Sequence, residues 1–486
     1  MPTRTLPAGL VALLLPVLAL AQAAPAPAAP PQADLERLRD AALASDGSLD
    51  VARDLCDRFG ARLSGSPQYE AAARWLGKEL EKAGLEVKLE KVMVPHWVRG
   101  EERAELVGWP GQGAGLVQPL HVTALGSSGA TPAAGATAEV VVVPDVAALQ
   151  ALPREKVQGR IVLVTTRFDR RLAESGEAGQ AYGVAVAGRS RGPALAAKLG
   201  AAALLIRSVG GAEFRLPHTG NTSFPKDVTP IPAGALAAED SDLVERLAAR
   251  GPVRLHLTMT PRTLPDVEQM NVVADLKGST RPDEVVILSG HLDSWDLGTG
   301  GLDDAAGVAQ AVEAVRLVKQ LGLRPRRTMR IVAWANEENG LRGGKAYAKA
   351  HAAELAGHQA ALESDMGAGR PLGVLFGADP AVEKLLAPVS KVLLPLGAGI
   401  VRSRDEVGAD IIPVHVAGVP VFAPMLDTRT YFDHHHTAAD TFDKIDPRGQ
   451  RENTAVMAVL GYHLASIEER LPQRPQPLPE WLKDDR

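Results

Sequence analysis

The sequence contains a single cysteine and few aromatic residues. Because Cys56 has no second thiol to pair with, an internal disulfide and a metal cluster of cysteines are both excluded. We interpret Cys56 as a small apolar residue of the helix-like stretch 51–59. Phe, Trp and Tyr make up 4% of the chain, so the core must be built mainly from Ala, Val and Leu.

The chain also lacks an excess of charge of one sign. Its 53 Lys and Arg residues face 58 Asp and Glu residues, which gives a net charge of −5. This balance argues against a nucleic-acid-binding protein, which carries a strongly basic face. With 45% hydrophobic and 23% charged residues, the 486 residues are expected to fold as two or three globular domains.

Long hydrophobic runs are missing except near the N-terminus. There the apolar stretch 10–20 follows the basic Arg4, as in an export signal. Because this stretch contains Pro16 and is too short to cross a bilayer, we predict a cleaved signal peptide, 1–23, rather than an uncleaved anchor. The Ala/Pro tract 24–33 then forms a linker. The mature protein is expected to be secreted or periplasmic, with no stable membrane span.

The outer parts of the chain alternate between strand and helix patterns. Apolar spacing predicts helices over 69–83 and 304–321, and a last helix over 449–469. The apolar runs 284–288 and 329–334 predict strands on either side of the second helix. Because both strands are apolar throughout, this order predicts a largely parallel, buried sheet flanked by helices.

The middle of the chain is rich in Gly, Ala and short Val runs, and predicts a unit of its own at 120–262. Its expected strands are 138–143, 159–165 and 201–206. We therefore predict a discontinuous α/β catalytic domain, 34–119 and 263–472, which this insert interrupts. The Pro-rich tail 473–486 is expected to pack little.

Acids and histidines follow directly after the apolar strands, where α/β folds place their ligands. His291 ends one strand and can bind a metal through one ring nitrogen, while Asp293 can accept from the other nitrogen and fix the tautomer. Asp303 and Asp304 begin the next helix. One carboxylate satisfies the helix cap, which leaves Asp303 free to coordinate.

Three further groups complete this pattern. Glu337 and Glu338 directly follow a buried strand, where their negative charges repel each other. A cation would offset this repulsion, with one glutamate as its ligand and the other as general base. Asp365 follows another short apolar run, and the histidines of 434–436 precede Asp440. Carboxylates mixed with neutral imidazole favour zinc, with cobalt or manganese as substitutes.

These residues stand within motifs that resemble the co-catalytic zinc exopeptidases, a family that includes bacterial aminopeptidases and glutamate carboxypeptidase. Within that family the resemblance is nearest to the carboxypeptidase Q branch and covers nearly the whole mature chain. The motifs that carry it are 62–66, 95–102, 205–208, 217–220, 289–296, 322–325 and 363–365. The resemblance implies an aminopeptidase-like α/β fold, with 120–262 as an inserted protease-associated domain.

The resemblance also implies a role for each site residue. His291 and Asp365 would bind one zinc ion, Glu338 and His436 the other, and Asp303 would bridge the two. The general base would be Glu337, and Asp293 would orient the first histidine. His435 would donate to the oxyanion of the transition state, whereas His434 is interpreted as a solvent-exposed neighbour.

The function implied is hydrolysis of the terminal peptide bond of dipeptides or short peptides by a water that two zinc ions activate. Small peptides are the expected partners, and the resemblance implies a homodimer. The sequence leaves open whether the N-terminal or the C-terminal residue is removed. The arginines considered for capture of a terminal carboxylate are Arg99, Arg207 and Arg402.

Two alternatives compete with this interpretation. The segment 188–192 matches the G-x-S-x-G elbow of serine hydrolases, with Ser190 as nucleophile, although its flanking arginines suit a solvated loop. A non-catalytic, receptor-like ectodomain of the same fold is the other alternative. The complete set of ligands and the base argues against it.

Overall fold

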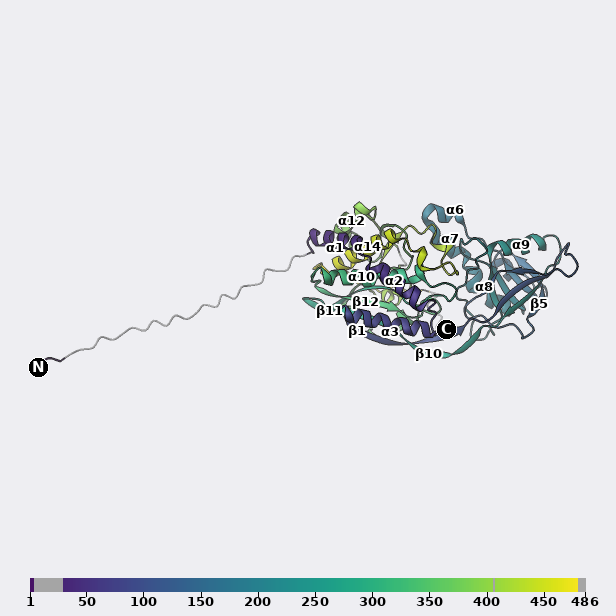
Figure 1. The fold of residues 1–486 in the computed structure, drawn as a ribbon, viewed down its shortest axis with the longest axis horizontal. Coiled ribbons are helices and arrows are strands. Elements are labelled where there is room, and N and C mark those ends of the chain that lie inside the picture. The colour runs from purple at the N-terminus through teal and green to yellow at the C-terminus, as the bar shows by residue number, and fades with distance from the viewer. Residues whose placement is uncertain (4–28, 405–406, 480–486) are drawn as a thin grey trace.

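The computed structural model describes residues 1–3, 29–404 and 407–479, which form two units that each contain a sheet (Figure 1). The predicted signal peptide, from residue 4 on, and the first half of the linker lie outside the described residues. Among the helices that are described, none combines the length and the apolar character needed to cross a membrane.

The larger unit is built on an eight-stranded sheet in the order β1-β10-β12-β11-β13-β16-β14-β15. Its central strands β12, β11, β13 and β16 run parallel, whereas β1, β10 and β14 pair in antiparallel fashion with their neighbours. This is the mixed, largely parallel sheet that the sequence predicted. The strands are β1 (Glu86–Val98), β10 (Arg262–Leu276), β11 (Arg281–His291), β12 (Arg327–Trp334), β13 (His358–Glu363), β14 (Pro371–Gly377), β15 (Ile400–Ser403) and β16 (Val421–Leu426).

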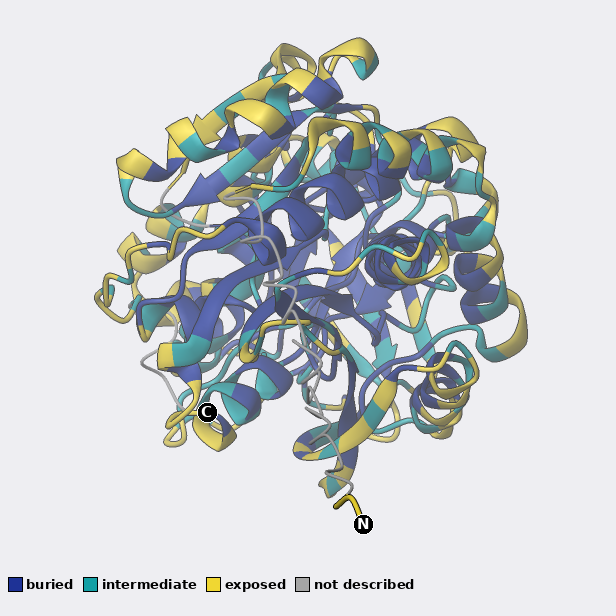
Figure 2. Ribbon diagram, turned by 90° about the vertical axis from the view of Figure 1, so that its left-hand side faces the viewer, coloured by how far each residue is buried: buried dark blue, intermediate teal, exposed yellow. Residues whose placement is uncertain are grey.

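Helices cover both faces of this sheet. In β11, Val286 and Leu288 point into one core with the helices α10 (Ala306–Gln320) and α14 (Pro447–Ser466), because side chains alternate between the faces of a strand. Val285 and Ile287 belong to a second core, under α11 (Arg342–Ala350) and α13 (Ile412–Val416). Helix α14 is buried along most of its length, and Figure 2 shows the dark interior around the sheet. The remaining helices of this unit include α1 (Gln32–Ala44), α2 (Gly47–Asp54), α3 (Pro67–Lys82) and α12 (Ala387–Leu393).

The smaller unit contains the second eight-stranded sheet, in the order β3-β2-β9-β5-β6-β7-β8-β4. The predicted strands of the insert correspond to β5, β6 and β7. Its strands are β2 (Glu102–Gly108), β3 (Gln118–Leu120), β4 (Val122–Ala124), β5 (Ala136–Val143), β6 (Ile161–Val164), β7 (Ala203–Arg207), β8 (Ala233–Leu236) and β9 (Arg254–Met259), with helices that include α7 (Ala178–Ala185), α8 (Ala187–Lys198) and α9 (Ala238–Ala248).

The smaller sheet begins earlier than the boundary predicted at residue 120. Strand β2 pairs with β9 from Glu102 onward, so this sheet takes in residues that the sequence assigned to the catalytic domain. The chain passes between the units at Glu101 and Thr260. There the backbone N–H of Thr260 donates to the carbonyl oxygen of Glu101, and the backbone N–H of Glu101 donates to the hydroxyl of Thr260. The assignment of this unit as a protease-associated domain stays a prediction.

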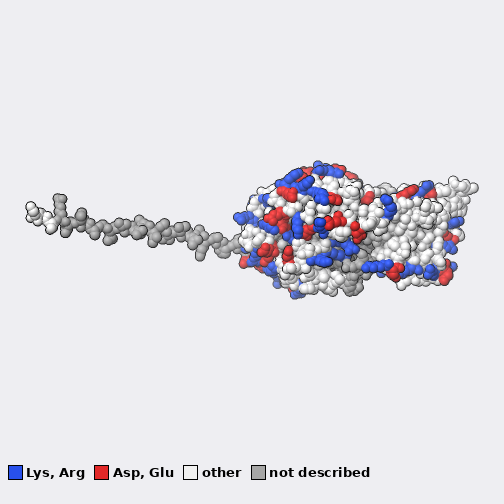
Figure 3. All heavy atoms as spheres, turned by 90° about the horizontal axis from the view of Figure 1, so that it is seen from below, with Lys and Arg blue, Asp and Glu red and all other residues white. Residues whose placement is uncertain are grey.

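The described part of the predicted tail, 473–479, has no buried residue, although hydrogen bonds attach it to the larger unit. Gln473 donates to the carbonyl oxygens of Leu355 and His358. The backbone N–H of Arg474 donates to the carbonyl of Gly418. On the face shown in Figure 3, basic and acidic side chains lie interspersed over this larger unit.

Candidate active site

The site residues gather because four neighbouring parallel strands end at one edge of the larger sheet. His291 is the last residue of β11, and Glu337 and Glu338 follow β12. Asp365 follows β13, and His436 lies beyond β16. Since parallel strands present their carboxyl ends together, segments far apart in the sequence meet at this edge.

One group of potential ligands consists of His291, Asp303 and Asp365. Nε2 of His291 lies 3.1 Å from Oδ1 of Asp303 and 3.2 Å from Oδ1 of Asp365. One atom from each residue lies within 4.8 Å of the others, which is close enough to surround a single ion. The Nδ1 atom of the same ring lies 3.0 Å from the backbone carbonyl of Asp293, which keeps a proton there and leaves Nε2 free.

A second group shares Asp303 with the first. Nε2 of His436 lies 3.0 Å from Oε2 of Glu338 and 3.3 Å from Oδ2 of Asp303. Asp303 thus turns Oδ1 toward one group and Oδ2 toward the other, as a bridging carboxylate does. Its buried Oδ2 has no hydrogen-bond partner within the described part of the chain. An uncompensated buried carboxylate oxygen is costly, and cations bound between the two groups would remove that cost.

Asp293 has a different contact from the one predicted. Its carboxylate lies 4.0 Å from Nδ1 of His291, and it is the backbone carbonyl that faces the ring. The carboxylate instead accepts from the backbone N–H groups of Glu337 and Glu338, at 3.0 and 3.3 Å, and from the hydroxyl of Ser64. The bend of the chain after His291 turns the side chain toward the glutamate loop, so Asp293 positions that loop as well as the histidine.

Other buried carboxylates fix the loop that carries Asp303. Asp304 accepts from the backbone N–H groups of His291 and Gly307, which satisfies the start of α10 as expected. Asp440 accepts from the N–H groups of Leu302 and Asp303, at 2.7 and 3.2 Å. These contacts hold the carboxylate of Asp303 between the end of β11 and the histidine segment.

The electrostatics of the site set Asp303 apart from the other acids. Burial raises the pKa of Glu337 well above its usual range, and the nearby charges of Asp365 and Asp303 raise it further. Burial also acts to raise the pKa of Asp303, but His435, His291 and His436 hold it well below the usual range. Burial raises the pKa of Glu338 and Asp365 as well, so several buried acids crowd this centre and Asp303 is the one that the histidines keep ionised.

A cavity of about 700 Å³ opens onto this centre. The larger unit contributes Glu337, Asp365 and Met366 to its lining, and the smaller unit contributes residues of α8 and of the 221–223 loop. Apolar rings line the side next to His435. A short peptide can therefore reach the potential ligands from a cleft between the two units.

The basic residues in this cavity differ from those considered in the sequence. Arg99 is occupied by Asp296 and Glu102, and Arg207 pairs with Asp242 on the smaller unit. Together with Arg402, on the edge strand β15, they lie outside the lining of the cavity within the described ranges. The basic residues that do line it are Arg189, Arg191 and Lys345. No motif marked the two arginines for this role, because their position depends on how the units meet.

The structure contradicts the serine-hydrolase alternative. Ser190 lies inside α8, which follows another helix, whereas a nucleophile elbow is a turn between a strand and a helix. Its hydroxyl donates to the carbonyl oxygen of Val186, 3.2 Å away, as serines within helices commonly do. The sequence match is therefore fortuitous.

Comparison with known proteins identifies the family. The model for peptidase family M28 matches residues 271–461, which contain every potential ligand named above. Mouse carboxypeptidase Q is 38% identical over 421 residues, 86% of this chain and 86% of that protein. Human carboxypeptidase Q is also 38% identical, over 86% of this chain and 85% of that protein. The chain belongs to peptidase family M28.

Solved structures agree with this assignment. The crystal structure of an M28 peptidase from Shewanella amazonensis has a TM-score of 0.86 and 37% identity, and covers 92% of this chain and 99% of that one. An aminopeptidase from an Aneurinibacillus species shares the fold, with a TM-score of 0.63 and 20% identity over 92% of this chain and 99% of its own. As an M28 peptidase the chain is a zinc-dependent exopeptidase, so the prediction of its enzyme class is confirmed and the receptor-like alternative is wrong.

Proposed function

We propose that this enzyme hydrolyses the terminal peptide bond of dipeptides and short peptides, with two zinc ions held at the ends of the parallel strands. The observation that carries the proposal is the position of Asp303, whose two carboxylate oxygens face two separate groups of potential ligands. Imidazole nitrogen and carboxylate oxygen form a donor set that suits zinc.

The residues fit a site with two ions. His291 and Asp365 would hold one, Glu338 and His436 the other, and Asp303 would bridge them. His436 is favoured over His435 because its Nε2 approaches Glu338 as well as Asp303. Zinc bound there would supply Lewis acidity and lower the pKa of a water molecule.

Glu337 is the general base of the proposed reaction. It lines the cavity beside Asp303 and Asp365, and its backbone is held by Asp293. Its carboxylate takes the proton of the attacking water and delivers it to the leaving amine. Cations at the site would counter the burial and the acidic neighbours that raise its pKa, so the carboxylate is ionised when the site is filled.

His435 is the proposed donor to the developing oxyanion. Its ring stacks on that of His436, with 3.6 Å between the centroids, and it lines the cavity. Its Nε2 lies 3.4 Å from Oδ2 of Asp303, so a proton on this nitrogen is directed toward the centre where the substrate carbonyl reacts.

The cavity favours a substrate with a free carboxylate. Once zinc offsets the acids of the centre, the remaining charged groups in the lining are Arg189, Arg191 and Lys345. A guanidinium group binds a carboxylate through paired N–H donors. The relatives named carboxypeptidase Q agree with this polarity, and we propose that the substrate carboxylate contacts the wall formed by α8.

The test combines metal removal with a panel of dipeptides. A chelator should abolish activity, and two equivalents of zinc should restore it. Free dipeptides should be cleaved much faster than the same dipeptides with an amidated C-terminus. Activity that survives chelation, or that a serine-directed inhibitor removes, would contradict the proposed chemistry. Equal cleavage of free and amidated dipeptides would contradict the carboxylate contact alone.

The N-terminal segment supports a proposal about location. The apolar stretch after Arg4 suits export, so we propose that the enzyme acts outside the cytoplasm. Fractionation of cells that express the full chain, with N-terminal sequencing of the product, tests this. The homodimer stays a prediction, and light scattering would test it.

A further inference from the structure

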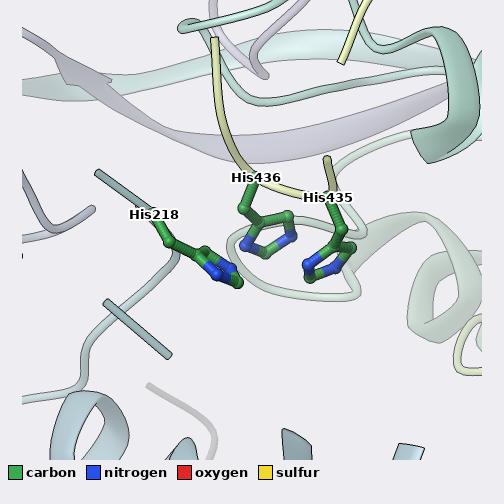
Figure 4. Close-up of side chains that lie close together, drawn as sticks. All are labelled: His218, His435 and His436. Atoms are coloured by element: carbon green, nitrogen blue, oxygen red, sulfur yellow. The ribbon is translucent and has the colours of Figure 1, made fainter. Parts of the chain in front are cut away.

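Beside the proposed zinc centre lies a cluster of three imidazole rings from two different segments (Figure 4). His435 and His436 belong to the larger unit, whereas His218 enters from the smaller unit. The ring centroid of His218 lies 5.2 Å from those of both other histidines. One nitrogen of each ring lies within 4.8 Å of the others, and all three residues are buried.

The nitrogens of this cluster are poorly satisfied. Neither ring nitrogen of His218 has a hydrogen-bond partner among residues 29–404 and 407–479, although its side chain is completely buried. Nδ1 of His435 is likewise without a partner in the part of the chain that the structure describes. An unsatisfied buried polar group is costly, so these nitrogens point to a ligand.

The surroundings leave ring nitrogens available as ligands, because both nitrogens of His218 and Nδ1 of His435 face no hydrogen-bonding group within the described residues. Arg189 lies 3.3 Å from Nδ1 of His436 and opposes a cation here, whereas Asp303, 3.4 and 3.3 Å from Nε2 of His435 and of His436, favours one.

We propose that His218, His435 and His436 form a nitrogen-only position for one divalent ion that prefers imidazole, such as Cu²⁺, separate from the two zinc positions but sharing His436. All-nitrogen ligands favour Cu²⁺ over Zn²⁺ and disfavour Mg²⁺, Ca²⁺ and Mn²⁺. The inference goes beyond the proposed function and depends on it only where it names His436 as a zinc ligand.

Sharing His436 makes the two arrangements compete. An ion bound by the three rings draws His436 away from Glu338 and removes a ligand from the second zinc ion. It also holds His435, the proposed oxyanion donor. Copper bound at this position therefore inhibits the zinc enzyme.

The experiment adds one equivalent of Cu²⁺ to the zinc-loaded full-length enzyme and records the electron paramagnetic resonance spectrum together with activity. Wild type should show hyperfine splitting from three nitrogens and lose most of its activity. His218→Phe keeps a ring of similar size, and His218→Asn keeps a polar group. Both variants should lose one nitrogen from the spectrum and keep most of their activity when Cu²⁺ is added.

His434→Gln is the matched control, because this neighbour in the triplet lies outside the cluster. It should behave as wild type in spectrum and in inhibition. The proposal is overturned if the wild-type spectrum shows fewer than three nitrogens, or if it is the same in both His218 variants. Failure of the zinc chemistry is seen separately, as absence of activity before any Cu²⁺ is added.

Discussion

The two units of this enzyme place functional groups in different ways. The larger unit carries the proposed zinc ligands and the proposed base at or after the ends of parallel strands, and buried carboxylates such as Asp293 and Asp440 fix the loops there. The smaller unit contributes Arg189 and Arg191, side chains on the surface of one helix, to the opposite wall of the cavity. The proposed reaction therefore depends on the sheet edge, whereas the proposed contact with the substrate carboxylate depends on the position of the smaller unit across the cavity.

The largest expected effect comes from Glu337 on the larger unit. Glu337→Gln keeps the shape of the side chain but removes the base, so kcat should fall by roughly 10²–10⁴-fold, the range of general base catalysis. The zinc content, measured by elemental analysis, should stay unchanged. Full activity of the variant with both ions bound would contradict Glu337 as the general base. The base would then be expected on the smaller unit.

The second largest expected effect is on the free energy of unfolding and comes from Arg99, which joins the two units. Arg99 follows β1 and binds Asp296 of the larger unit through two hydrogen bonds of 2.9 and 2.6 Å, while it also contacts Glu102 and Thr219. Arg99→Gln leaves two largely buried carboxylates without their cation, and should lower the free energy of unfolding by roughly 3 kcal/mol. Urea unfolding monitored by fluorescence checks this value.

Arg103→Gln is the control for this joint, because Arg103 is exposed and pairs with Glu105 on the surface. Its effect should stay below about 1 kcal/mol. Equal effects for the two variants would show that Arg99 does not join the units, and that the alignment of the smaller unit rests on its apolar contacts.

The sheet edge could be predicted from the sequence because its signal is local. Three of the potential ligands, His291, Glu338 and Asp365, end an apolar strand or follow one within a few residues, and parallel strands must end together, so the residue pattern alone groups them. The cap role of Asp304 likewise followed from its place at the start of a helix. Such inferences need only the strand pattern and the period of the side chains.

Contacts set by chain reversals or by the meeting of the units were not predictable in this way. The backbone at Asn336, Leu341 and His436 adopts left-handed φ angles, which nothing in those residue types requires and which aim the loops at the site. For the same reason the carboxylate of Asp293 was assigned the wrong partner. Arg189, Arg191 and His218 reach the site only because the smaller unit folds back over it.

A smaller effect tests the smaller unit directly. Arg191 is exposed in the lining of the cavity, and Arg191→Gln removes a charge that the proposed carboxylate contact uses. Loss of a charge-assisted hydrogen bond in partly exposed surroundings should raise KM by about tenfold with kcat nearly unchanged. Arg171→Gln, an exposed arginine elsewhere on the same unit, serves as control. A fall in kcat at constant KM would instead assign Arg191 to the reaction, and the division between the units would fail.

The smallest expected effect comes from a pair in the larger unit that lies away from the site. It tests whether the free energy of unfolding of this unit can change while kcat stays the same. Burial acts to raise the pKa of Glu90, but hydrogen bonds from His351 and Lys88 lower it to about 2. The hydrogen bond to Glu90 raises the pKa of His351 above its usual 6.5, although burial opposes the shift.

The sign of each shift sets the pH window. A lowered carboxyl pKa contributes stability above the unfolded value of 4.5, and that contribution is lost as the pH falls toward 2. A raised histidine pKa contributes below 6.5, and that contribution is lost as the pH rises through the folded value. Glu90→Gln should therefore destabilise most between about pH 4.5 and 6.5, by about 1 kcal/mol for this pair, whose side chains are 10% and 9% exposed. Urea midpoints at about pH 3, 5.5 and 9 check the window.

The same variant should keep its kcat, since the Glu90–His351 pair touches none of the described site residues. A parallel loss of activity would mean that β1 also positions the residues at the sheet edge.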